Sequence, residues 1–189
     1  MFTGNLEYLM SSLPHLIFKD GDEERLRVFS ILKKYADPIR KDSSLVAILE
    51  EEAMKFLSPS EFIVFRQIDL NSIHSEHFQK SRNTVLTAFS NHVFWLKSET
   101  RKLRLSRRKG AESSSIIKTL LLENPGNPLN EEIQLLKWQW TKLEDLSIGH
   151  DSDFEGLCIY KLKLLILLRW WGFNPKKGFD VFLTLTKSD

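Results

Sequence analysis

The segment from Phe154 to Trp171, which reads FEGLCIYKLKLLILLRWW, constrains the fold of this 189-residue chain more than any other stretch. It is apolar around most of its circumference, a pattern typical of a helix that is buried on several sides. Lys161, Lys163 and Arg169 interrupt it, so it lacks the about 20 consecutive apolar residues that cross a bilayer. We therefore expect a central core helix, in which the stems of Lys161 and Lys163 follow apolar neighbours toward water.

The rest of the chain offers partner helices with recognisable ends. A helix is expected over residues 22–36, with acidic residues in its first turn and Asp37-Pro38 at its end. Ser43 can cap a second helix, and Ser58-Pro59-Ser60-Glu61 can open a third. The residues that indicate these helices are Leu26, Phe29, Leu32 and Lys33 along one side of the first, Leu45, Ile48, Leu49 and Phe56 in the second, and Phe62, Phe65 and Ile68 in the third.

A longer pattern covers residues 81–108. Its residues at three- and four-residue intervals are Val85, Phe89, His92, Val93, Leu96 and Leu103. This period predicts one amphipathic helix of roughly 25 residues, broken at Gly110. Further helices are expected over 116–122, after an Asn127-Pro128 cap, from the Asp153 cap to a left-handed Gly172, and after Asn174-Pro175.

Composition agrees with a helical fold, because 8 glycines and 6 prolines are few for a turn-rich all-β protein. Residues 5–18 show no clear helical period and contain Pro14, so an extended segment or a short strand is expected there. The predicted fold class is mainly α. It is a multi-helix bundle with one long amphipathic helix, a central buried C-terminal helix and this short N-terminal extended segment.

The length suits a single helical domain over 1–189. The polar stretch 110–115 is the candidate boundary between N-terminal helices in 1–109 and Trp-rich C-terminal helices in 116–189. Four of the five tryptophans, Trp138, Trp140, Trp170 and Trp171, are expected in the core; exposed members would instead mark an aromatic interface. Cys158 is expected to be a packed side chain rather than a nucleophile.

A basic run at the end of the long helix is the strongest candidate for function. Its cations, opposed only by Glu99, are Lys97, Arg101, Lys102, Arg104, Arg107, Arg108 and Lys109. This window carries 7 − 1 = +6, which leaves 2 − 6 = −4 for the rest of the chain. The run can be a solvated helix end, a docking site for an acidic protein or a nucleic-acid site. Nucleic acid is the least favoured because no aromatic residue interleaves with the cations.

Catalytic and metal-binding motifs are weak. His74 and His77 could bring two nitrogens together, but further ligands at familiar spacing are missing. His150 and Asp153 are better explained as a loop with a helix cap, and neither a Gly-x-Ser-x-Gly elbow nor a Gly-rich phosphate loop occurs. We expect no catalytic, metal-binding or cofactor-binding residues, and an enzyme only if a pocket forms around Tyr160 and His150. The N-terminus lacks the features of a secretory signal, which predicts a cytoplasmic protein.

Two stretches resemble a known family. A Ser-Leu-Pro motif is matched by Ser12, Leu13 and Pro14. An Asn-Pro-Leu motif that leads into a helix with a Leu-x-Trp core is matched by Asn127, Pro128, Leu129, Leu136 and Trp138. A Lys-Leu-x-Ile-Leu-x-Arg-Trp pattern is matched by Lys163, Leu164, Ile166, Leu167, Arg169 and Trp170. With these residues the chain resembles an uncharacterised bacterial family that accompanies V-type ATPase subunits, although the tyrosine-rich start of that family is reduced to Tyr8.

The resemblance implies a non-catalytic subunit, or an assembly or coupling factor, of a bacterial V-type ATPase. Such a protein could take the place of the C-type subunit that couples the central stalk to the membrane rotor ring. The implied partners are other subunits of that ATPase, with no small-molecule substrate, and the protein would lie at the inner membrane only through the complex. The alternative is an independent helical nucleic-acid-binding or adaptor protein that uses the run 97–109.

Overall fold

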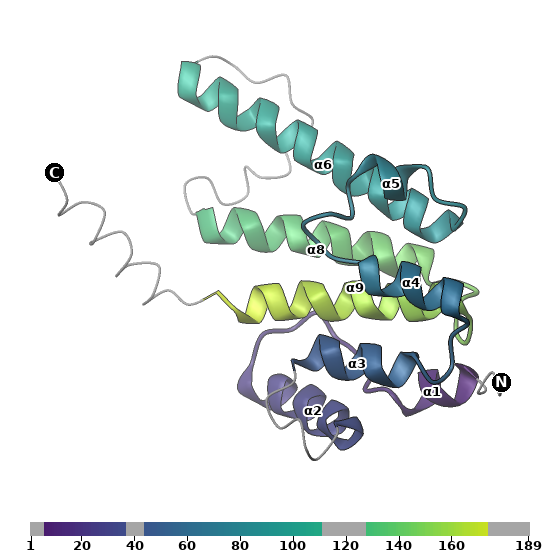
Figure 1. The fold of residues 1–189 in the computed structure, drawn as a ribbon. Helices are drawn as coiled ribbons and strands as arrows, with labels where there is room; N and C mark the ends of the chain where they lie inside the picture. The colour runs from purple at the N-terminus through teal and green to yellow at the C-terminus, as the bar shows by residue number, and fades with distance from the viewer. Residues whose placement is uncertain (1–5, 37–43, 111–127, 174–189) are drawn as a thin grey trace, which may run out of the picture.

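The structure, a computed structural model, describes residues 6–36, 44–110 and 128–173. All regular structure in these ranges is helical (Figure 1), so the predicted mainly α fold class is confirmed. The elements are α1 (Leu6–Ser12), α2 (Asp22–Leu32), the 3₁₀ helix η1 (Lys33–Tyr35), α3 (Leu45–Ala53), α4 (Pro59–Gln67), α5 (Glu76–Gln79), α6 (Thr84–Lys109), α8 (Pro128–Leu146) and α9 (Phe154–Trp171). Among them, no helix has the length and apolar character needed to span a membrane.

Several expectations lie outside the described residues. They are the helices over 116–122 and after Asn174-Pro175, the caps at Ser43 and Asn127, and the boundary within 111–115. The cap of α3 that the structure does describe is Ser44, whose side chain accepts a hydrogen bond from the Ala47 amide at 3.2 Å.

Helix α9 is the centre of the bundle. It contacts α8, α6, α3 and α1, and Figure 1 shows it between α8 and α3. Its side chains at Leu157, Leu162, Leu164 and Leu167 are fully buried. The prediction of a central buried helix is therefore confirmed, and burial of Cys158 confirms that this thiol is a packed side chain.

The long helix α6 begins and ends close to where its pattern predicts. The Asn83 side chain accepts a hydrogen bond from the Leu86 amide at 2.9 Å, and Gly110 ends the helix in the left-handed region with φ 63°. Gly110 takes this conformation at no steric cost because it lacks a Cβ. At the end of α9, by contrast, Gly172 is right-handed with φ −76°, so the predicted left-handed closure there is wrong.

The expectation of extended structure over residues 5–18 is wrong for residues 6–12, because they form helix α1. Leu9 of this short helix is buried, and Leu6 and Met10 pack against the same core. Two turns are too short for a periodicity to be recognised, and Pro14 favours extended backbone only just after the helix. Residues 13–18 have no regular structure.

Helix α2 turns a different side to the core than its apolar spacing suggested. Leu26 and Phe29 are exposed, whereas Glu24, Val28 and Leu32 are buried. Glu24 is accommodated because Arg27 forms an ion pair with it at 2.5 Å. The buried side of a helix is therefore set by where its neighbours lie, and a charged residue with a partner can belong to it.

Lys161 overturns the expectation that both lysines of α9 reach water. Its side chain is fully buried, and its ammonium donates hydrogen bonds to Glu50 at 2.6 Å and to the Phe65 carbonyl at 2.7 Å. Burial lowers the pKa of Lys161, while Glu50 acts in the opposite direction. The Phe65 carbonyl lies at the C-terminal end of α4, and together with Glu50 it takes the place of water around this cation. Lys163 is half-buried, with its ammonium 5.2 Å from the Trp140 ring centre.

The four clustered tryptophans divide between core and margin. Trp140 is buried, so its predicted place in the core is confirmed. Trp170 and Trp171 are half-buried and pack against the main core, and Trp138 packs against a smaller cluster between α6 and α8. Phe18 stacks on Trp170 with ring centres 4.3 Å apart, and this contact packs the N-terminal segment against the end of α9.

Candidate functional site

One face of α6 lines a cleft. Lys97, Arg101, Arg104 and Arg108 follow one another at intervals of four, three and four residues, which places them on one side of the helix. These four residues, the cleft row, line a cavity of about 410 Å³ together with residues of α8 and the end of α9. Because an α-helix rises 1.5 Å per residue, the row extends for about 16 Å.

The inner surface of the cleft is aliphatic. Buried lining residues are Leu70 from the segment before α5, Val93 and Leu96 from α6, and Leu135 and Leu136 from α8. Leu105, which is 45% exposed, lies among the cations of α6 and also lines the cleft. The site therefore combines apolar surface with charge in one concave region.

The charge of the cleft is strongly positive. Arg169 from α9 joins the cleft row, and Glu132 of α8 is the one carboxylate among the described lining residues, so the balance is 5 − 1 = +4. Arg169 donates a hydrogen bond to Glu132 at 2.6 Å. Within the described part of the chain, no hydrogen bond or ion pair engages Arg101, Arg104 or Arg108. As far as the described residues go, these three cations therefore have room for an external anion.

Lys97 has a different environment at the inner end of the row. Partial burial lowers the pKa of Lys97, and the positive charge of Arg169 lowers it further. Its ammonium lies 2.9 Å from Nδ1 of His74, whose own pKa is lowered by burial and by Lys97. His77 instead lies 3.2 Å from the Gln67 side chain. The two histidines considered as a metal pair thus have separate partners.

The other three cations of the run lie outside the cleft. Lys102 pairs with Glu99 on the same helix at 2.6 Å, and Arg107 reaches across to Glu131 of α8 at 2.6 Å. Lys109 is the last residue of α6. The predicted run is therefore divided into a cleft row of four, two ion-paired cations and one helix end.

A second groove lies on the other side of the contact between α6 and α8. Its volume is about 260 Å³, and its lining includes His92, Trp95 and Trp138, with Leu96 shared between this groove and the cleft. Trp95 is 40% exposed. Nε2 of His92 is buried without a hydrogen-bond partner among the described residues, and burial lowers the pKa of this ring. Trp95 is more than 40 residues from the nearest other tryptophan, so closeness in the sequence does not reveal that it lies beside Trp138.

A pocket also forms around Tyr160 and His150, where the sequence left room for an enzyme. It has a volume of about 370 Å³ and lies between residues 10–16, the connector before α9, and α9 itself. The Tyr160 hydroxyl donates a hydrogen bond to the Pro14 carbonyl at 3.0 Å, and burial raises its pKa. This arrangement ties the Ser-Leu-Pro segment to α9.

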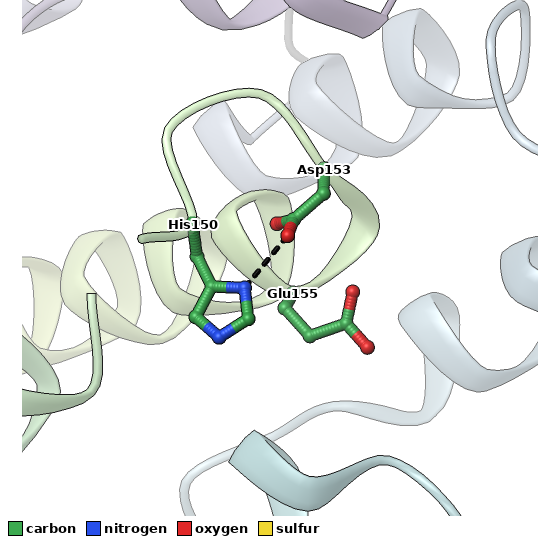
Figure 2. Close-up of side chains that lie close together, drawn as sticks. All are labelled: His150, Asp153 and Glu155. Carbon is green, nitrogen blue, oxygen red and sulfur yellow. Dashed lines mark hydrogen bonds and ion pairs between the residues drawn. The ribbon is translucent and has the colours of Figure 1, made fainter. Parts of the chain in front are cut away.

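His150, Asp153 and Glu155 gather beside this pocket at the start of α9 (Figure 2), with one ligand atom from each within 4.8 Å of the others. Asp153 accepts the Gly156 amide at 2.8 Å and lies 2.6 Å from His150 Nδ1. This contact with Asp153 raises the pKa of His150. Glu155 accepts a hydrogen bond from Asn83 at 3.2 Å. Each group has a structural partner, in agreement with the predicted loop and helix cap.

Comparison with known proteins adds no family to this geometry. No family model matches the chain, and neither a curated protein nor a solved structure matches it. The features that bear on function are therefore the cleft and the places that the described motif residues occupy in the fold.

Proposed function

We propose that the chain is a non-catalytic adaptor that binds an acidic protein surface in the cleft between α6, α8 and α9. The observation that carries this proposal is a concave aliphatic surface bordered by a net charge of +4. Complementary charge accelerates encounter and fixes orientation, and buried aliphatic surface supplies binding free energy. Both effects act without any catalytic group.

The proposed partners are other subunits of a bacterial V-type ATPase, for which the chain would be a coupling or assembly factor. Support comes from the residues that carry the family resemblance. The Ser-Leu-Pro segment is joined to α9 by the hydrogen bond between Tyr160 and Pro14. Arg169, which belongs to the Lys-Leu-x-Ile-Leu-x-Arg-Trp pattern, lines the cleft beside the cleft row. The Ser-Leu-Pro segment, Arg169 and the cleft are thus parts of one packed unit.

A native pull-down tests this proposal. Tagged protein is recovered from the cytoplasmic and membrane fractions of its own cells, and the co-purifying proteins are identified. We expect V-type ATPase subunits with the wild-type chain and their loss with the cleft variant Arg101→Glu/Arg104→Glu/Arg108→Glu. A matched control is Lys34→Glu/Arg82→Glu/Lys137→Glu, which reverses three exposed cations outside the cleft and should retain the partners.

The outcomes separate the parts of the proposal. Equal recovery of partners by the wild type and the cleft variant would show that the cleft is not the docking site. Recovery of other proteins through the cleft would refute the V-type ATPase assignment and leave the adaptor function. Recovery of nucleic acid, with an affinity that falls steeply as salt rises, would favour the nucleic-acid-binding alternative.

A further inference from the structure

We infer that the ligand of the cleft is an amphipathic α-helix of the partner protein, with a row of carboxylates at intervals of four, three and four residues beside a row of aliphatic side chains. This inference deepens the proposed adaptor function and rests on it. It specifies the chemistry of the bound surface, which the adaptor proposal leaves open.

The spacing of the cleft row is the first argument. The cations lie on one face of α6 over about three turns, and a partner helix lying along them repeats with the same rise. Carboxylates at the same intervals would therefore each lie opposite one cation. The side chains of Arg101, Arg104 and Arg108 are exposed, and none forms a hydrogen bond or ion pair with a described residue. Binding to the carboxylates of a partner helix would therefore break no such contact.

The lining of the cleft is the second argument, because it distinguishes a helix from nucleic acid. The described lining contains aliphatic residues and no aromatic ring. Proteins that bind single-stranded nucleic acid stack bases on aromatic side chains, and phosphate contacts need no apolar surface. Aliphatic side chains on a partner helix would instead fill the space between Leu96, Leu105 and Leu135.

The sequence also bears on the source of the helix. No stretch of the 189-residue sequence has carboxylates at intervals of four, three and four residues. Neither another segment of these 189 residues nor a second copy of them therefore offers the complementary row, which favours a helix of a partner protein.

Two synthetic peptides of about 18 residues, long enough to form helix, test the inference. The row peptide has four glutamates at the stated intervals beside leucines, and the scrambled peptide has the same composition with the glutamates spread around the helix. Binding of each labelled peptide to the full chain is measured by fluorescence anisotropy. We expect the row peptide to bind about tenfold more tightly than the scrambled peptide, because several exposed ion pairs each add a little affinity.

Three variants sharpen the test. Arg101→Glu/Arg104→Glu/Arg108→Glu should abolish the preference for the row peptide, and the Lys34→Glu/Arg82→Glu/Lys137→Glu control should keep it. Leu105→Ala, at an exposed position that tolerates truncation, should weaken the row peptide about fivefold because it removes apolar contact. Circular dichroism of every variant confirms that the helical fold is retained.

Equal affinity for the two peptides, or no binding of either, would overturn the inference. Tighter binding of an oligonucleotide than of the row peptide, unchanged by Leu105→Ala, would overturn it in favour of a phosphate backbone. These failures differ from a failure of the adaptor proposal. If the cleft variant still loses its native partners in the pull-down, the adaptor proposal holds and only the inferred helical ligand is wrong.

Discussion

Lys161 and the cleft row place the same kind of charge in opposite surroundings. The ammonium of Lys161 lies inside the bundle, within hydrogen-bond distance of Glu50 and the Phe65 carbonyl. Arg101, Arg104 and Arg108 of the cleft row are exposed, and no described residue binds them. One cation is compensated by the fold, whereas the other three have no compensating group in the described part of the chain.

The difference follows from the cost of removing charge from water. A buried ammonium persists only when the protein replaces its hydration with hydrogen bonds and an opposite charge. A charge in an open cleft keeps much of its hydration and needs no such partner. Compensated cations should therefore matter for stability, and uncompensated cations for binding. Variants at each kind of cation test this division.

Replacement of Lys161 should have the largest effect on stability. Lys161→Met keeps the length of the side chain but leaves Glu50 and the Phe65 carbonyl without the cation that binds them. We expect the free energy of unfolding to fall by about 3 kcal/mol, the loss typical when one partner of a buried ion pair is removed. Urea denaturation followed by circular dichroism measures the change.

Lys163→Met is the matched control for this variant on the same helix. Lys163 is half-buried and contacts the Trp140 ring, so its loss should cost about 1 kcal/mol or less. Glu50→Gln provides a milder change at the same buried pair. Equal stability of Lys161→Met and the wild type would refute the view that Lys161 holds α9 to α3 and α4.

The ion pair between Arg107 and Glu131 should have an intermediate effect. It joins α6 to α8 at 2.6 Å, and the Glu131 side chain is largely buried while that of Arg107 is 44% exposed. A double-mutant cycle with Arg107→Gln and Glu131→Gln should give a coupling energy of about 1 kcal/mol. Lys102 and Glu99 form the comparison pair within α6. A coupling energy near zero would show that the Arg107 pair does not stabilise the packing of α6 on α8.

The cleft row should have almost no effect on stability. Arg101→Gln/Arg104→Gln removes two exposed cations that bind no described residue. The free energy of unfolding should stay within about 0.5 kcal/mol of the wild type, because such surface changes are normally near neutral. The same denaturation series measures it. A loss comparable to that of Lys161→Met would show that these arginines are structural and would remove the basis of the division.

Much of the fold could be predicted from the sequence because apolar periodicity and caps are local. The pattern of α6 and the capping sequence at Ser58 are both present in the structure, where Ser58 and Glu61 form a capping box. Lys161 could not be predicted, because its partners are about 100 residues away in the sequence. The exposed side of α2 was misjudged for the same reason: the position of its neighbours is not a local property.

The candidate site was predictable only in part. The intervals between Lys97, Arg101, Arg104 and Arg108 already place these residues on one face of a helix. The aliphatic lining and Arg169 come from α8 and α9, so the cleft exists only once three helices have packed. The sequence therefore reveals the charged run. Which of its cations form ion pairs within the protein and which line the cleft is known only from the fold.

A small and pH-dependent effect is expected at His150, a cation near the surface that Asp153 compensates. The contact with Asp153 raises the pKa of His150 above its ordinary value of 6.5, so the protonated ring stabilises the folded state. This contribution is complete below that ordinary value and is lost as pH rises through the raised folded pKa. Wild type should therefore exceed His150→Gln in free energy of unfolding at about pH 5.5, and the difference should shrink at about pH 8.5. A difference that is the same at both pH values would mean that the ring acts only through its shape and neutral hydrogen bonds, because a charge that the fold compensates must lose its effect when the proton is removed.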